Sequence, residues 1–119
     1  MSLTKQEGDL GEAIATKFLK KSGYKILELN YRTPLGEIDI IAKDKETIVF
    51  VEVKTRSSKK FGLPGEAVNY QKQRHIRNSA LYYLKSKGLL DKVSARFDVI
   101  SILMSNITDY EIEHLQNAF

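Results

Sequence analysis

GEIDII at residues 36–41 and VEVKTR at residues 51–56 are the two stretches that decide the fold. Their apolar residues are mainly isoleucine and valine, which favour β-strands. Both stretches also carry charged side chains among these apolar residues. Because burying a charge is costly unless it is paired or coordinated, we expect these charges to serve chemistry.

Strand alternation predicts which of these side chains share a face of the sheet. One face of the first strand is expected to hold Glu37, Asp39 and Ile41. One face of the second is expected to hold Phe50, Glu52 and Lys54.

The segment between the two strands suits a tight reversal, with residues 45–46 as a two-residue loop. Asp44 then pairs with Thr47, and counting back places Asp39 opposite Glu52. Lys54 lies one diagonal step away. Two like charges roughly 5 Å apart repel by about 3 kcal/mol at an effective dielectric constant of about 20. A positive group is therefore expected between them, and a divalent cation is the natural candidate.

Composition limits the kind of metal site. The chain has no cysteine, which excludes thiolate zinc sites and cysteine nucleophiles. Its two histidines, His75 and His114, lie far apart in the sequence and are expected to be structural or solvent-facing. A hard ion held by oxygen ligands, Mg²⁺ or Mn²⁺, is the expected cofactor.

Length and charge set the broad class. The chain has 119 residues, of which 42% are hydrophobic, and this predicts a single domain over residues 1–119. We find neither a signal-peptide pattern nor a membrane-span pattern, so a cytoplasmic location is expected. A net charge of +4 is mildly suggestive of a polyanionic partner such as DNA.

The order of elements predicts an α/β fold. Apolar periodicity predicts helices from residue 4 to Gly23 and over 66–87, the first opened by a capping box of Thr4 and Glu7. Strands are predicted over 24–31, over the two central stretches, and over 95–103 and 109–115. This gives a mixed central sheet flanked by helices. A ferredoxin-like sandwich has similar elements and stays open as an alternative.

The charged hairpin suits phosphodiester hydrolysis, which needs a nucleophilic water and stabilisation of charge on phosphorus. Asp39 and Glu52 are the expected metal ligands, and the carbonyl of Val53 is the third candidate. Lys54 is expected to position the water and stabilise the phosphate charge. The alternative is an exposed sheet face with a cross-strand salt bridge.

The arrangement from Asp39 to EVK at residues 52–54, between two helices, resembles the PD-(D/E)XK nuclease superfamily. Nearly the whole chain, including GEIDIIAKD and VFVEVKTR, is similar to the YraN family of predicted endonucleases, itself similar to archaeal Holliday junction resolvases. The resemblance implies a restriction-endonuclease-like αβββαβ core and metal-dependent cleavage. It also implies that Glu12 is a further acidic site residue. Ile38 stands where the superfamily's name has proline.

Basic residues are expected to form a rim that contacts phosphates around the acidic hairpin. They are Arg56, Lys59, Lys60, Lys72, Arg74 and Arg77. The leading hypothesis is a metal-dependent endonuclease acting on DNA, with branched or irregular DNA as candidate substrates. Paired cuts on a symmetric junction need two copies, so a homodimer is the working hypothesis.

Two rival functions stay open. One is a catalytically inactive nucleic-acid-binding module of the same fold. The other is a structural or interaction protein whose hairpin charges only form salt bridges. Asp98, in an apolar strand, is expected either to be hydrogen-bonded in the core or to support the site.

Overall fold

The computed structural model describes residues 5–57, 68–106 and 108–119. Its elements in chain order are α1 (Lys5–Lys21), β1 (Lys25–Thr33), β2 (Gly36–Asp44), β3 (Thr47–Ser57), α2 (Tyr70–Ser86), β4 (Ser94–Met104) and β5 (Tyr110–Leu115). Neither of the two helices in these ranges is long and apolar enough to cross a membrane.

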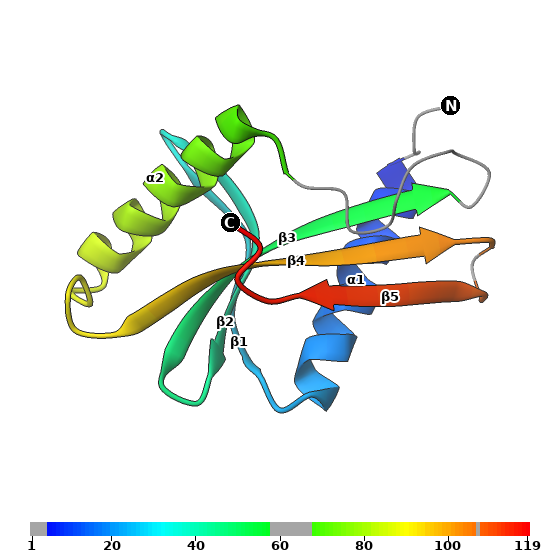
Figure 1. The fold of residues 1–119 in the computed structure, drawn as a ribbon, viewed down its shortest axis with the longest axis horizontal. Helices are drawn as coiled ribbons and strands as arrows, with labels where there is room; N and C mark the ends of the chain where they lie inside the picture. Colours follow the sequence, from blue (N-terminus) through cyan, green and yellow to red (C-terminus); the bar gives the residue numbers. More distant parts are fainter. Residues whose placement is uncertain (1–4, 58–67, 107) are drawn as a thin grey trace.

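The strands form one mixed sheet in the order β1-β2-β3-β4-β5. β3 and β4 are parallel, and the other neighbouring pairs are antiparallel. Figure 1 shows α2 and α1 packed against different parts of this sheet. The predicted α/β class with an αβββαβ core is confirmed, and β5 extends the sheet beyond β4.

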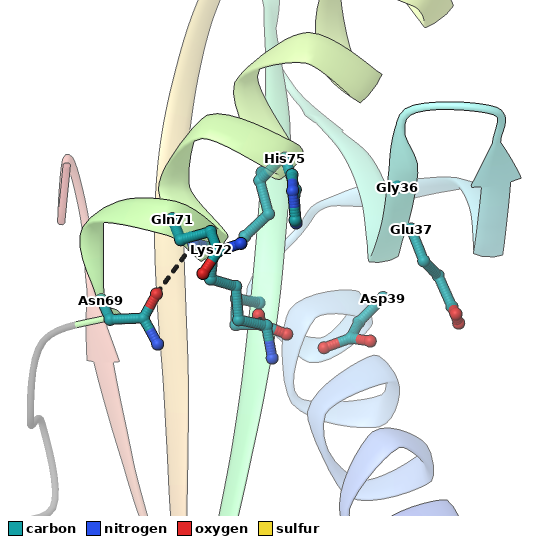
Figure 2. A pocket seen from close by; sticks show the side chains of 9 residues that line it. Gly36, Glu37, Asp39, Asn69, Gln71, Lys72 and His75 are labelled. Carbon is teal, nitrogen blue, oxygen red and sulfur yellow. Dashed lines mark hydrogen bonds and ion pairs between the residues drawn. The ribbon is translucent and has the colours of Figure 1, made fainter.

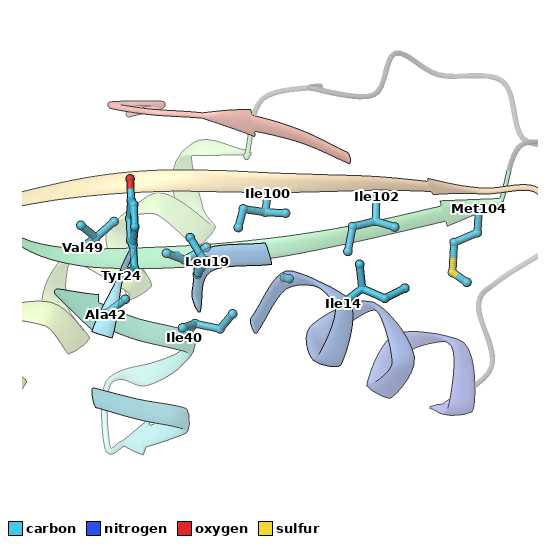
Figure 3. Packing of buried hydrophobic residues seen from close by; sticks show 11 residues of the cluster. Ile14, Leu19, Tyr24, Ile40, Ala42, Val49, Ile100, Ile102 and Met104 are labelled. Carbon is cyan, nitrogen blue, oxygen red and sulfur yellow. The ribbon is translucent and has the colours of Figure 1, made fainter. Parts of the chain in front are cut away.

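The two helices cover opposite faces of the sheet, and this divides the core into two apolar layers. One layer packs Ile14 and Leu19 of α1 against Ile40, Val51 and other strand residues (Figure 3). The other packs α2 residues against the opposite face of the same strands. A ferredoxin-like sandwich, with both helices on one face, is thereby excluded.

The helix ends follow from local signals. Gly23 and Gly88 both have positive φ and end α1 and α2 in Schellman motifs, as predicted. The predicted start of α2 at residue 66 is wrong for residues 68 and 69, which are not helical. Asn69 is extended, and its side chain accepts a hydrogen bond from the backbone N–H of Lys72 at 2.8 Å. This N-cap fixes the first turn at Tyr70. The predicted cap at Thr4 lies outside the described residues.

The predicted hairpin register between β2 and β3 is confirmed from Asp44 opposite Thr47 to Ile40 opposite Val51. The ladder ends there. Instead of a backbone pair at the next position, the backbone N–H of Val53 donates to Asp39 Oδ2 at 2.8 Å. The carboxyl of Asp39 thus takes the place of a ladder hydrogen bond.

Strict alternation along 37–41 is wrong. Ile38 and Ile41 both pack in the α2 layer, whereas Ile40 packs in the α1 layer. The break coincides with Asp39, where β2 parts from β3. Asn30, in the neighbouring part of β1, has a φ of 49°. A local irregularity of this kind re-aims a side chain.

Two glycines allow the helices to approach the hairpin closely. A side chain at Gly11 of α1 would collide with Thr55 of β3. At Gly36, which has a φ of 150°, a Cβ would lie 3.1 Å from His75 Cβ and 3.2 Å from its carbonyl oxygen. Both helices are therefore held against the end of the hairpin that carries the charged residues.

Candidate active site

A pocket of about 520 Å³ lies between this end of the hairpin and the first turns of α2. Figure 2 shows Glu37 and Asp39 on β2 at one side, and Asn69, Gln71 and Lys72 at the start of α2 on the other. The remaining lining residues are Gly36, Glu52, His75 and Ile76.

Asp39 and Glu52 meet in this pocket. The side chain of Glu52 is 5% exposed. Burial, followed by a hydrogen bond to Glu52 and the charge of that residue, raises the pKa of Asp39 to about 8, although the N–H of Val53 acts in the opposite direction. The raised pKa favours the protonated form of Asp39 beside Glu52. The sequence-based expectation of two acids facing one another agrees with this geometry.

The positive group at the pair is Lys72 of α2. Its Nζ lies 2.9 Å from Glu52 Oε2. Oε2 is buried and has no other hydrogen-bond partner among the described residues, so the ion pair with Lys72 is its main polar contact. Lys72 was expected on the basic rim, and its place beside Glu52 was not foreseen. The signal that would have found it is its position at the N-terminus of the helix packed over the hairpin.

Lys54 is half-buried on β3, two residues beyond Glu52 and so about 7 Å along the strand. Alternation puts it on the α2 face with Glu52. Lys54 is not among the residues that line the pocket, and it has interactions of its own. Its role stays a prediction.

Glu12 lies next to this pair but lines a neighbouring pocket of about 500 Å³ between α1 and β1. Burial and then the charge of Asp39 raise the pKa of Glu12, and a hydrogen bond with Asn30 opposes them. Glu12 is thus close enough to Asp39 for their charges to interact. Its side chain is half-buried.

The residues present suit a hard cation. Mg²⁺ commonly takes one or two carboxylates and completes its octahedron with water and phosphate oxygens. The pocket offers Asp39 and the unpartnered Oε2 of Glu52. The carbonyl of Val53 faces the same strand edge as its N–H, which bonds Asp39. Within the described ranges, no three His, Cys, Asp or Glu side chains gather to hold a metal. Two carboxyl groups and one carbonyl are nonetheless the oxygen donors that Mg²⁺ takes when water and phosphate complete its octahedron.

The remaining basic residues expected on the rim are dispersed. Arg56 is half-buried on β3, and Arg74 is exposed on α2. The guanidinium of Arg77 lies over the rings of Phe97 and Phe119, 4.8 and 5.7 Å from their centroids. Lys59 and Lys60 lie outside the described residues.

His75 is exposed and lines the pocket, whereas His114 and Asp98 belong to a separate cluster in the core. Asp98 is fully buried and accepts hydrogen bonds from Arg96, His114 and the backbone N–H of Asn117. Of the two roles open for Asp98, the structure supports hydrogen bonding in the core. His114 is structural, as expected.

Comparisons with known proteins define the family. Residues 11–102 match the Uncharacterised protein family UPF0102, and the chain belongs to this family. A UPF0102 protein of Clostridium acetobutylicum is 51% identical over 118 residues, covering 98% of this chain and 96% of that protein. One from Alkaliphilus oremlandii is 52% identical, covering 98% and 100%. The resemblance is thus confirmed at the level of the family, whose description names no activity.

Among solved structures, an EndoMS–dsDNA complex is similar with a TM-score of 0.48 and 18% identity. The match covers 91% of this chain and 41% of the EndoMS chain, so this chain spans less than half the length of that protein.

Proposed function

We propose that the protein is a metal-dependent endonuclease that hydrolyses phosphodiester bonds in DNA at the Asp39–Glu52 pocket. The observation that carries this proposal is the meeting of a buried carboxyl group, Glu52, and a half-buried one, Asp39, in an open pocket, where Glu52 Oε2 has no hydrogen-bond partner among the described residues. Strongly perturbed carboxyl groups in a cleft are typical of functional sites. The resemblance of the sequence to PD-(D/E)XK nucleases favours the same chemistry.

Asp39, Glu52 and the Val53 carbonyl would hold Mg²⁺, and Mn²⁺ is the expected substitute. When bound, the cation supplies Lewis-acid stabilisation of negative charge on the phosphate. Asp39 must lose its proton for the site to load. Burial of Glu52 between sheet and helix keeps its carboxylate fixed in one orientation.

Hydrolysis adds one water molecule across a P–O bond, and chain residues must position that water and neutralise the phosphate. We assign the positioning of water to Lys54, on the Glu52 face of β3. Glu12, whose charge interacts with that of Asp39, supports the acidic side of the site. Arg56, Lys72 and Arg74 are the described basic residues assigned to phosphate contacts, together with Lys59 and Lys60.

DNA is the proposed partner because the chain has a net charge of +4 and because Lys72 lies on the α2 side of an acidic pocket. Branched or irregular DNA is the proposed preference, on the strength of the resemblance to junction resolvases. A homodimer acting in the cytoplasm completes this proposal, because paired cuts need two sites.

The experiment is a cleavage assay on labelled linear, nicked and four-way DNA with Mg²⁺ or Mn²⁺. Asp39→Asn and Glu52→Gln should lower the rate by more than the roughly 10- to 100-fold that outer-shell residues of metal sites cost. The matched control is Glu46→Gln, which removes one charge from the exposed turn of the same hairpin and should leave the rate unchanged.

Cleavage that survives both site substitutions would reject the assignment of the site. DNA binding with a clear salt dependence but no cleavage with either metal would instead support the inactive binding module. Failure to bind either metal or DNA would leave the structural protein as the better reading.

A further inference from the structure

Lys72 is placed where it contacts the acid pair without being locked there. Its side chain is 53% exposed, whereas that of its partner Glu52 is 5% exposed. Although Nζ lies 2.9 Å from Glu52 Oε2, that oxygen has no hydrogen-bond partner among the described residues. The ammonium therefore supplies charge to the buried oxygen from the exposed side, and its half-exposed side chain leaves it a path to solvent.

The position of Lys72 in its helix is unfavourable by itself. Asn69 caps α2, which makes Lys72 the third residue of the first turn, and no acidic residue occupies that turn. The positive end of the helix dipole lies at this terminus, so anionic side chains are favoured there and cations are not. Attraction to the acid pair is what compensates for this placement.

The charged groups facing Lys72 come from two strands. Burial alone would lower the pKa of Lys72, but the carboxylate of Glu52, followed by Asp39 and Glu37, outweighs burial and raises it. Lys72 is therefore a permanent cation at neutral pH. Its charge is directed at the same Glu52 oxygen that is available to a metal ion.

We propose that Lys72 is an internal counter-ion that occupies the cation position of the pocket and competes with a divalent metal for Glu52. This inference rests on the proposed metal site and goes beyond it. Binding of the metal displaces the ammonium toward solvent, which its half-exposed side chain can reach. The released ammonium then lies at the rim of the pocket, where a phosphate group can accept it. Binding of the metal is thereby coupled to the exposure of a cation that can bind phosphate.

The test is isothermal titration calorimetry of Mn²⁺, and separately Ca²⁺, into the full chain without DNA. Lys72→Gln removes the competing charge and should bind Mn²⁺ at least about tenfold more tightly than the wild type. In the metal-free state, the melting temperature of Lys72→Gln should be lower than that of the wild type, and Mn²⁺ should restore it.

Lys85→Gln is the matched control, because it removes the same charge from an exposed position in the last turn of α2, outside the residues that line the pocket. It should bind Mn²⁺ within about twofold of the wild type, since exposed charges at that distance are screened. Lys72→Arg keeps the charge, so it should keep the wild-type affinity or bind more weakly.

Equal gains in Mn²⁺ affinity for Lys72→Gln and Lys85→Gln would overturn the inference, because the effect would then come from the general positive charge of the helix. If the wild type binds Mn²⁺ and Lys72→Gln binds it no more tightly, the inference about Lys72 fails and the proposed metal site stands. If wild type and all variants bind neither metal, the proposed metal site and this inference both fail.

Discussion

The sheet holds two groups of charged residues, each built around one buried carboxyl side chain, and the two groups differ in how many hydrogen bonds that side chain accepts. Asp98 on β4 is fully buried, and both its oxygens accept hydrogen bonds. The donors are Arg96 at 3.1 and 3.2 Å, His114 at 2.8 Å and the N–H of Asn117 at 3.1 Å. Glu52 on β3 is nearly as buried, but within the described part of the chain its Oε2 has no hydrogen-bond partner.

The pKa values separate the two groups further. Burial would raise the pKa of Asp98, but the hydrogen bonds from His114, Arg96 and Asn117 lower it. Burial and Glu52 raise the pKa of Asp39 to about 8. A carboxylate surrounded by fixed donors stabilises the fold, whereas two carboxyl groups facing each other cost stability. The Asp98 cluster is thus a satisfied structural group, whereas the Asp39–Glu52 pair, to which we assign the proposed function, is not satisfied by fixed donors.

The largest expected effect is that of Asp98→Asn. The amide is neutral and presents N–H groups to residues that are themselves donors, so the buried Arg96 charge loses a partner. We expect the free energy of unfolding to fall by about 3–5 kcal/mol, measured by urea denaturation. Asp91→Asn is the control, because Asp91 is exposed with a φ of 63°, which asparagine tolerates. A similar loss of unfolding free energy in Asp98→Asn and Asp91→Asn would show that Asp98 has no special structural role.

Adding metal tests the Asp39–Glu52 pair. At a Ca²⁺ or Mn²⁺ concentration about 100 times the Kd, binding to the folded state alone adds about 2.7 kcal/mol. The melting temperature of the wild type should therefore rise by several degrees, and that of Asp98→Asn, if folded, should rise as well. Asp39→Asn should not respond. An equal rise in Asp39→Asn would place the metal elsewhere.

Acid pH should weaken the Asp98 cluster. Because the folded-state pKa of Asp98 lies below its ordinary value of 3.8, its contribution is fully present above that pH. It is lost as pH falls below about 4, through the folded-state pKa. The unfolding free energy of the wild type should approach that of Asp98→Asn between pH 5 and 2.5, by an amount on the order of 1 kcal/mol, in a urea series. If the difference in unfolding free energy between the wild type and Asp98→Asn stayed constant over this pH range, the lowered pKa of Asp98 would be contradicted.

A smaller effect of opposite sign is expected for Asp39→Asn in metal-free protein. The amide oxygen can still accept from the Val53 N–H, while the acid pair is removed. We expect the unfolding free energy to rise by about 1 kcal/mol. The same Asp→Asn change is thus expected to destabilise the protein at position 98 and to stabilise it at position 39. A loss as large as that of Asp98→Asn would assign Asp39 to the structural class.

The smallest effect concerns basic residues near each group. Arg77 lies over Phe97 beside the Asp98 strand, so Arg77→Gln should cost about 0.5–1 kcal/mol of stability. Arg74→Gln, on the exposed surface, should cost less stability but should reduce the salt slope of DNA binding by about 1. Fluorescence anisotropy across salt concentrations measures the second quantity. If Arg77→Gln and Arg74→Gln changed the salt slope of DNA binding equally, Arg77 would be assigned to phosphate contacts as well.

Local signals made much of the fold predictable. The Asp44–Thr47 turn sets the register of the hairpin, and Gly23 and Gly88 end the helices, because these features depend on neighbours in the chain. The start of α2 was expected too early because the capping side chain of Asn69 competes with a periodic pattern that continues before it. The break at Asp39 was not predictable, since it appears only where β2 parts from β3.

The sequence by itself determined the two central strands, the turn between them and a register that brings Asp39 toward Glu52, because turn length fixes which residues pair. Only the tertiary structure decided which cation meets them. Lys72 is twenty residues from Glu52 in the chain and reaches it because α2 packs over that face of the sheet. Such a contact depends on how a helix crosses a sheet, and no local pattern encodes that crossing.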